Sequence, residues 1–566
     1  MICDVAPSSS ALGLTPNASD STSHAVGFRR VGWNASTGFS LNGVPTKIRG
    51  NANHQDFAGV GVAVPDALQT YRVAKLQSFG ANGWRTAHNA PTPALLDAAD
   101  RLGMLVWDEN HRNGQDDELR TLVLRDRHHP SIIIWSICNE KLCDTADAKS
   151  TRADGERLAA LFHALDPAGD RVVSANYNPW LGPNTPLDLQ GVDYATYMYD
   201  AVHSLAPHLP AISSETSSAV SDRGEYANNA TAGHVRGYDT EAPSWGETAE
   251  GAWGGVGMPK SQGILTRGFM SGGFTWTGWD YKGEPTPYAW PDINSHFGIL
   301  DIASFEKDRY FWYASHFKSF AKGQGMIHLL PHWNWAGTGH ARAPPHLAPC
   351  VGLCTSHGAG GATVDVWAFT NGANAELFLN GKSLGVAKVE QYAHAEWKAV
   401  PYAPGNLTAV ATDSAGAVLA TQTVMTTGAA AALRVSVRDS VGDSKAHGHG
   451  GGIVAGCNDV ALVQVEVVDT AGRVVPTAAH SVTLSSTGPA TFVGGGNGDP
   501  ACHVGDKNWT RPAFHGKLLG AFVSTKSEGT VTVRATAAGL TAGSVEVKAV
   551  KAGFDSTWWC ARLPEV

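Results

Sequence analysis

Residues 131–140 read SIIIWSICNE, and this stretch decides the fold. A short, continuous apolar run is typical of a strand that is buried on both faces of a parallel sheet. The run ends at Asn139 and Glu140, so an amide and a carboxylate are expected at the carboxyl end of the strand. Ligands of parallel sheets bind at this edge, and the polar pair therefore marks a candidate site.

Similar runs lie on both sides of this stretch and alternate with longer amphipathic segments. We expect eight strands, at residues 46–50, 83–86, 104–107, 131–137, 171–175, 192–197, 211–214 and 273–276. Eight such units over about 280 residues match the size of a (β/α)₈ barrel, whose active site lies where the strands end. A doubly wound sheet is the alternative, but the glycine-rich phosphate loop that normally follows its first strand is absent from the sequence after residue 50.

Two of the intervening helices have clear boundary residues. Pro65 or Asp66 opens the segment PDALQTYRVAKLQSF, while Thr92 and Pro93 open PALLDAADRLG, which Gly103 ends. Proline at a helix start and glycine just past its end are the usual residues at these positions.

The pattern of apolar and polar residues changes after about residue 325. Asn-Gly pairs at 371–372 and 380–381 lie between runs of alternating polarity, which predicts antiparallel hairpins. A later stretch, DVALVQVEVVDTAGRVVP, repeats this pattern in what reads as an immunoglobulin-like sandwich. We therefore expect a multidomain α/β and all-β protein with a TIM barrel and two β-sandwiches, divided into an N-terminal extension (1–35), the barrel (36–325), a linker (326–358), a β-sandwich (359–428) and an immunoglobulin-like β-sandwich with the C-terminal tail (429–566).

The net charge of −9 is modest for 566 residues, and Lys and Arg are scattered singly. This distribution argues against a nucleic-acid partner. No apolar run reaches the roughly 20 residues needed to cross a bilayer, so no membrane partner is expected either. Neutral substrates are favoured, and no oligomeric state follows from the sequence.

Cysteines and processing signals leave the compartment open. Cys350 with Cys354, and Cys457 with Cys502, could form disulfides, although sequence does not fix the separations of their Cα atoms. No basic segment followed by an apolar one is visible at the start of the chain. A secreted or lumenal protein remains one interpretation because glycosylation tripeptides begin at Asn17, Asn34, Asn229, Asn406 and Asn508.

A second expected strand also ends in a carboxylate, because the run AISSE delivers Glu215 to the same rim as Glu140. Two carboxylates facing each other across the barrel mouth suit glycoside hydrolysis with retention, in which one protonates the leaving oxygen and the other attacks the anomeric carbon. A separation of about 5–5.5 Å between the two carboxyl groups permits this direct attack. A lone glutamate at a strand end is more often a solvated or capping residue, but two on the fourth and seventh strands favour the catalytic interpretation.

Several separated motifs occur between about residues 30 and 385: FSLNGVPTKIRGNANHQD, NGWRTAHNAPTPALLDAADRLGMLVWDE, RDRHHPSIIIWSICNE, ISSETSS, GGFTWTGWDYKGEP and AELFLNGKSLG. With them the chain resembles glycoside hydrolase family 2, which includes β-galactosidases, β-mannosidases and β-glucuronidases. The resemblance implies a retaining exo-acting β-glycosidase on a (β/α)₈ barrel, with a β-glycoside or oligosaccharide as substrate. No cofactor and no metal ion are expected.

Carried over position by position, the resemblance makes Glu140 the acid/base and Glu215 the nucleophile. It places Asn139 at the sugar 2-hydroxyl and Arg85 near the nucleophile, where Arg85 could also simply hold Glu215 in place. Tyr199, after the run DYATYM, resembles the tyrosine that hydrogen-bonds the nucleophile.

The same resemblance implies residues around the sugar. His54 and His88 look like the histidines of the sugar subsite, and Trp276 looks like the aromatic platform beneath the sugar. The alternatives are structural histidines and a core tryptophan. Asp108 and Glu109, at the end of the third expected strand, could bind substrate or bridge to helix residues.

Members of the family usually carry a jelly-roll domain and a first immunoglobulin-like domain before the barrel. Here the barrel is expected to begin almost at once, so we expect these domains to be missing, with either a fragment or substitution by the remaining modules as the explanation. The motifs, including DYKGEPTPY, look most like those of β-galactosidases, so a terminal β-D-galactoside is the expected substrate. A β-glucuronidase should offer a separate Asn-x-Lys motif, whereas the tripeptide here begins at Asn139 and contains Glu140 itself. A β-mannosidase, and a catalytically inactive carbohydrate-binding protein, remain alternatives.

Overall fold

The computed structural model describes residues 2–5, 20–23, 27–110, 116–140, 148–167, 169–176, 185–238, 248–254, 263–335, 363–438 and 452–551. Eight parallel strands form one sheet in the order β10-β9-β8-β7-β6-β13-β12-β11. The (β/α)₈ barrel is therefore confirmed. Its strands are β6 (Ile48–Asn53), β7 (Gly83–Thr86), β8 (Leu105–Glu109), β9 (Ile132–Asn139), β10 (Val172–Asn176), β11 (Gln190–Asp193), β12 (Ala211–Ser217) and β13 (Met270–Trp276).

The two edge strands of this sheet approach each other and nearly close the barrel. The Asp188 N–H, just before β11, donates to the carbonyl oxygen of Val173 on β10 at 3.1 Å. A Cβ at Gly191 would lie 2.1 Å from the carbonyl oxygen of Ala175, so only glycine permits this approach.

Helices cover the outside of the barrel in the expected alternation. Thr92 precedes α2, Pro93 is its first residue, and Gly103 ends it in the left-handed conformation with φ 74°. The buried faces of the helices and the outward faces of the strands form one continuous apolar core. The described helices are α1 (Asp66–Gln77), α2 (Pro93–Leu102), α3 (Asp116–Asp126), α4 (Ala148–Leu165), α5 (Tyr199–Leu205), α6 (Ala249–Trp253), α7 (Asp308–Phe317) and the short 3₁₀ helices η2 (Thr196–Met198) and η3 (Ile264–Thr266).

The expected strand at 192–197 is wrong at its end. β11 stops at Asp193, and Tyr194 and Ala195 have φ values of 50° and 44°, which turn the chain into η2. The apolar run DYATYM thus belongs to a strand end, a tight turn and a helix start, which periodicity alone does not separate.

Large side chains fill the barrel interior, among them Trp107, Ile134 and Phe274. A small antiparallel sheet closes the end at which the strands begin, and its Phe39 is buried in the same cluster. This sheet begins within the expected N-terminal extension and consists of β3 (Val31–Asn34), β4 (Gly38–Leu41) and β5 (Val44–Pro45). A separate hairpin of β1 (Ile2–Val5) and β2 (Asp20–Ser23) precedes it.

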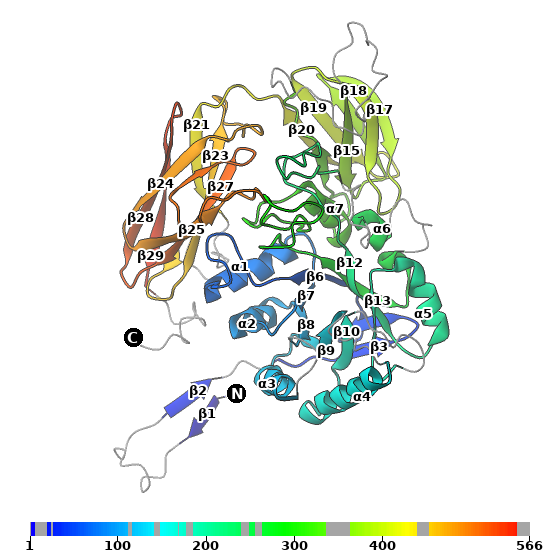
Figure 1. Cartoon of the computed structure of the whole chain (residues 1–566). Helices are drawn as coiled ribbons and strands as arrows, with labels where there is room; N and C mark the ends of the chain where they lie inside the picture. Colours follow the sequence, from blue (N-terminus) through cyan, green and yellow to red (C-terminus); the bar gives the residue numbers. More distant parts are fainter. Residues whose placement is uncertain are drawn as a thin grey trace, which may run out of the picture.

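Two β-sandwiches follow the barrel, and Figure 1 shows them side by side above it, one yellow-green and one orange to red. The first has sheets β14-β15-β18 and β17-β16-β19-β20 around its own apolar core. Its first strand comes from the segment expected as a linker. The bounds are β14 (Ile327–Leu330), β15 (Thr363–Thr370), β16 (Asn374–Leu379), β17 (Lys382–Lys388), β18 (Ala395–Pro401), β19 (Asn406–Thr412) and β20 (Val418–Met425).

The second sandwich has sheets β21-β23-β27-β25 and β22-β29-β28-β24-β26 around a Val- and Ala-rich core. Both expected sandwiches are thereby confirmed. The strands are β21 (Ala432–Val437), β22 (Ile453–Val454), β23 (Val460–Val468), β24 (Ser481–Thr487), β25 (Ala490–Gly496), β26 (Thr510–Pro512), β27 (Lys517–Ser524), β28 (Gly529–Ala537) and β29 (Gly543–Val550).

The second sandwich packs against the barrel loop that follows β6. Phe57 and Ala58 of this loop share an apolar cluster with Leu519 of β27. Backbone meets backbone at one point, where a Cβ on Gly59 would lie 2.5 Å from the carbonyl carbon of Gly494. Gly59 also has a φ of 85°, so this contact requires glycine twice over.

The cysteine pairing expected between Cys457 and Cys502 is wrong, because Cys502 is a free thiol while Cys457 is disulfide-bonded. The other expected pair, Cys350 with Cys354, lies outside the described residues. Among the helices described, none combines the length and the apolar character needed to cross a bilayer.

Candidate active site

Polar side chains gather where the barrel strands end, as expected from the topology. Arg85 lies in β7, Glu109 ends β8, Asn139 ends β9 and Glu215 lies near the end of β12. Neighbouring strands add Asn176 at the end of β10 and Asp193 at the end of β11.

Arg85 connects the carboxylates of this group. Its guanidinium is fully buried and donates to both oxygens of Glu109, at 2.9 and 3.0 Å. The same group donates to Glu215 Oε2 at 2.5 Å and to Asn139 Oδ1 at 2.7 Å. These carboxylates raise the pKa of Arg85 and, in turn, the guanidinium and His88 hold the pKa of Glu109 below its usual range despite its burial. The cation is therefore permanent and its two anionic partners are fixed in place.

Glu215 accepts three hydrogen bonds. The donors are Arg85, the Asn176 amide at 3.3 Å and the Tyr194 hydroxyl, which reaches Oε1 at 2.8 Å. The carboxyl group is buried, with 4% of the residue exposed. Three donors aimed at one carboxylate hold its oxygens in a fixed position, as an attacking group requires.

Glu140 directly follows β9 and lies opposite Glu215. One carboxylate oxygen of each residue, together with one of Asp193, lies within 4.8 Å of the others. Burial and the nearby charge of Glu215 raise the pKa of Glu140. The two glutamates thus have opposite environments: Glu215 is surrounded by donors, and Glu140 is surrounded by like charge.

Tyr194, rather than Tyr199, contacts Glu215. The Tyr194 hydroxyl also lies 2.7 Å from Ser218 Oγ, which fixes its orientation. Tyr199 lies at the start of α5, fully buried, with its ring beneath the guanidinium of Arg267 at 5.7 Å. The sequence placed the wrong tyrosine here because β11 ends four residues before the expected strand at 192–197 does.

Asp108 points away from the substrate side, which corrects its expected role. Side chains alternate along β8, so Trp107 and Glu109 face the barrel axis while Asp108 faces the helices. Burial and the nearby Asp126 of α3 raise the pKa of Asp108 well above its usual value. Its neighbour Glu109 takes the place in the site, bound to Arg85 and within 2.8 Å of His88 Nδ1.

His54, His88, Trp276 and Tyr281 form an aromatic wall beside the carboxylates. The rings of His88 and Trp276 stack with centroids 5.1 Å apart, and His54 lies 4.2 Å from the Tyr281 ring. Burial and nearby positive charge lower the pKa of His54 to about 3, so this imidazole is neutral. The Trp276 indole donates to the Tyr281 hydroxyl at 3.1 Å, and that hydroxyl donates to Glu284. The wall therefore combines apolar ring faces with polar edges, as sugar sites do.

Comparisons with known proteins agree with this arrangement. Residues 35–119 and 115–239 match the model of the TIM barrel domain of glycosyl hydrolases family 2, and residues 449–546 match the model of glycoside hydrolase family 2 C-terminal domain 5. Residues 361–420 match a domain of unknown function. The chain is 30% identical over 587 residues to the β-galactosidase BoGH2A of Bacteroides ovatus.

The chain belongs to glycoside hydrolase family 2. A β-glycosidase from Bacteroides vulgatus has a similar solved structure, with a TM-score of 0.77 and 26% identity over 94% of this chain and 68% of that one. A β-glucuronidase of Formosa agariphila is 24% identical over 95% of this chain. The chain spans 64% of the B. ovatus protein and 51% of the F. agariphila protein.

For this family 2 chain, the sequence named Glu109 together with Asp108 but did not indicate Asn176, Asp193 and Tyr194 as site residues. These three lie at or directly after the end of a barrel strand, so the signal was present. Asn176 is one residue past the strand expected at 171–175. The expected strand ends differ from the observed ones by one and four residues, and this difference hid the three side chains.

The spacing of Glu140, Asp193 and Glu215 would also suit a metal ion. Acidic groups often lie this close together without an ion, so the expected absence of a metal stays a prediction.

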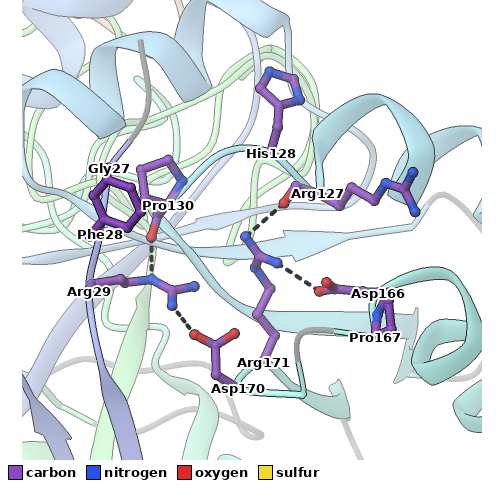
Figure 2. A pocket seen from close by; sticks show the side chains of 10 residues that line it. All are labelled: Gly27, Phe28, Arg29, Arg127, His128, Pro130, Asp166, Pro167, Asp170 and Arg171. Atoms are coloured by element: carbon purple, nitrogen blue, oxygen red, sulfur yellow. Dashed lines mark hydrogen bonds and ion pairs between the residues drawn. The ribbon is translucent and has the colours of Figure 1, made fainter. Parts of the chain in front are cut away.

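A cavity of about 600 Å³ at the opposite end of the barrel is a structural feature. Figure 2 shows Arg29 reaching the Pro130 carbonyl and Asp170, and Arg171 reaching Asp166 and the Arg127 carbonyl. These residues precede β9 and β10, so the cavity lies where strands begin rather than where they end. Arg29 thus joins the N-terminal segment to the barrel, while Arg171 joins segments of the barrel to one another.

Proposed function

We propose that this protein is a retaining exo-β-glycosidase for neutral sugars, with terminal β-D-galactosides as the expected substrates. Glu140 would be the acid/base and Glu215 the nucleophile. The observation that carries the proposal is the placement of their carboxylate oxygens within 4.8 Å, with Glu215 held by three donors. This separation suits direct attack on the anomeric carbon rather than attack by an intervening water.

In the first step, Glu215 Oε attacks the anomeric carbon while Glu140 gives its proton to the leaving oxygen. The bond from carbon to the leaving oxygen breaks, and a covalent sugar–Glu215 ester forms. In the second step, the Glu140 carboxylate takes a proton from water, and the water oxygen displaces Glu215 with a second inversion. The raised pKa of Glu140 supports this role, because the group must begin the cycle protonated.

Charge supports a neutral rather than an acidic glycone. Glu109, Glu140, Glu215 and Asp193 lie together, and Arg85 is already bonded to the first and third of them. Glu284 adds a further carboxyl group on the rim, close enough for its pKa to be raised by Glu215. A glucuronide carboxylate entering this part of the described structure would meet like charge, and its recognition would require a cation that is not already paired.

The aromatic wall supports exo action. Its stacked His88 and Trp276 rings offer an apolar surface to one pyranose ring, and neutral His54 can donate or accept a hydrogen bond at a hydroxyl. Asn139 accepts hydrogen bonds through Oδ1 from Arg85 and Asn176, which leaves its amide nitrogen as the group directed to a sugar hydroxyl.

A panel of 4-nitrophenyl β-glycosides tests the proposal. We expect hydrolysis of the galactoside by the wild-type protein and its loss in Glu140→Gln and Glu215→Gln. Glu118→Gln, an exposed change on α3, is the matched control and should behave as wild type. Preferred cleavage of the glucuronide would overturn the neutral-sugar assignment, and sugar binding without hydrolysis would indicate a carbohydrate-binding protein.

Two further measurements test the roles of the glutamates. A 2-deoxy-2-fluoro glycoside should leave a covalent adduct on the peptide that contains Glu215, detected by mass spectrometry. Azide added to Glu140→Ala should restore turnover of an activated substrate and give the β-glycosyl azide, because a small anion can attack the glycosyl ester without a general base. An α-azide product would refute retention.

A further inference from the structure

Asp193 is a third carboxyl group in contact with both proposed catalytic glutamates. It ends β11, where its Cα is paired in register with that of Glu215 on β12. One of its oxygens lies within 4.8 Å of oxygens of Glu140 and Glu215, and it makes a side-chain hydrogen bond with Glu140. The proposed mechanism needs an acid and a nucleophile, and it assigns no task to this third group.

The acidic groups around Asp193 outnumber the positive charges that could stabilise them as anions. The groups that face Asp193 are Glu140 on β9, Glu215 on β12, Arg85 on β7 and the hydroxyl of adjacent Tyr194. The charge of Arg85 is already shared between Glu109 and Glu215. Like charges at this distance in a buried site force at least one carboxyl group to keep its proton.

One oxygen of Asp193 has no donor directed at it. Oδ1 is buried and accepts no hydrogen bond from any donor among the described residues. A buried carboxylate with an unsatisfied oxygen is strongly disfavoured, whereas a neutral carboxylic acid that donates one bond is tolerated much better.

We propose that Asp193 remains protonated throughout the catalytic cycle and donates a hydrogen bond to Glu140, as the positioning residue of the acid/base. The inference rests on the proposed function of Glu140. Burial and the charges of Glu215 and Glu140 raise the pKa of Asp193 well above its usual value, in agreement with a neutral group.

This hydrogen bond would act on the Glu140 proton in two ways. When Glu140 is protonated, its carbonyl oxygen accepts from Asp193, so the hydroxyl oxygen is left to face the leaving group. When Glu140 is ionised, the bond becomes charge-assisted and stabilises the carboxylate that must next activate water. Asp193 gives up no proton in either step.

Two substitutions separate a neutral donor from a charged neighbour. Asp193→Ala removes the donor, so the Glu140 carboxylate loses stabilisation and the upper limb of the kcat/KM pH profile should move to higher pH by about one unit. Asp193→Asn restores an uncharged donor, so the limb should return to its wild-type position and most of the lost rate should recover. If Asp193 is ionised instead, Asn removes a negative charge beside Glu140 and the limb moves to lower pH, which overturns the proposal.

Infrared difference spectroscopy gives a readout that does not depend on turnover. The spectrum of wild type minus Asp193→Asn at neutral pH should contain the carbonyl band of a neutral carboxylic acid. Asp117→Asn, an exposed change on α3, should give only a carboxylate band. A carboxylate band at Asp193 refutes the proposal even if the protein proves active, and the acid band supports it even if the protein hydrolyses none of the glycosides tested.

Discussion

Replacing Tyr194 by Phe removes one of the three donors to Glu215 and leaves the ring in place. The lost bond, 2.8 Å from Tyr194 Oη to Glu215 Oε1, is a hydrogen bond to a charged group, and such bonds contribute about 1.5–3 kcal/mol. At about 1.36 kcal/mol for each tenfold change in rate, the loss of this bond should lower kcat/KM by roughly 10–100-fold. The effect is expected because, in the proposed mechanism, the Tyr194 hydroxyl orients the carboxylate that attacks the anomeric carbon.

The assay is the kcat/KM profile of an aryl β-glycoside from acidic to alkaline pH. At the pH optimum of the wild type, kcat/KM of Tyr194→Phe should be about 10–100-fold below that of the wild type. Tyr199→Phe is the matched control: it loses the same hydroxyl 5 residues along the chain, on a helix away from Glu215, and its kcat/KM should stay at the wild-type value. A lower kcat/KM in Tyr199→Phe with an unchanged one in Tyr194→Phe would refute the assignment.

Three further outcomes are expected. Because the pKa of Glu140 is raised, kcat/KM should fall as the pH rises through that pKa. With a substrate whose leaving group needs no proton, Glu140→Gln should no longer show this fall at alkaline pH. A fall that persists in Glu140→Gln would belong to another residue. Arg85→Met leaves buried carboxylates without their cation and should cost about 3–5 kcal/mol of unfolding free energy in urea. The pKa of Glu109 is lowered in the folded wild type, so the ion pair with Arg85 loses its contribution to stability as the pH falls through that pKa. Arg85→Met should instead lose stability as the pH rises, because its buried carboxylates then ionise without a cation. The same trend in both proteins would contradict the pairing of Glu109 with Arg85. Asp108→Asn should keep kcat/KM within about twofold of wild type, because this buried side chain faces the helices and not the substrate; a larger loss would indicate that Asp108 contacts the substrate.

The barrel was predictable from the sequence because each strand is a short apolar run with a polar end. That pattern placed Glu140 and Glu215 on one rim, and the structure brings both together with Arg85 and Asn139. The family motifs also placed His54, His88 and Trp276, which the structure brings into the aromatic wall.

The remaining site residues depended on details that periodicity does not contain. Asp108 and Glu109 are adjacent acids, and only the register of β8 determines which of them faces the barrel axis. Tyr194 and Tyr199 both follow the same strand, and the positive φ values at Tyr194 and Ala195 decide which one meets Glu215. Such choices are fixed by tertiary packing rather than by local sequence.

The contact between Gly59 and Gly494 ties the C-terminal module to the segment that begins with His54, directly after β6. Removing the second sandwich, from residue 452 onward, would remove the contacts that hold that segment. We expect weaker sugar binding in the truncated protein, although all the proposed sugar-binding residues are retained. On heating, the barrel and the second sandwich should therefore unfold together in one calorimetric peak. Phe57 and Leu519 pack in the same cluster, so each becomes exposed to water when the other unit unfolds.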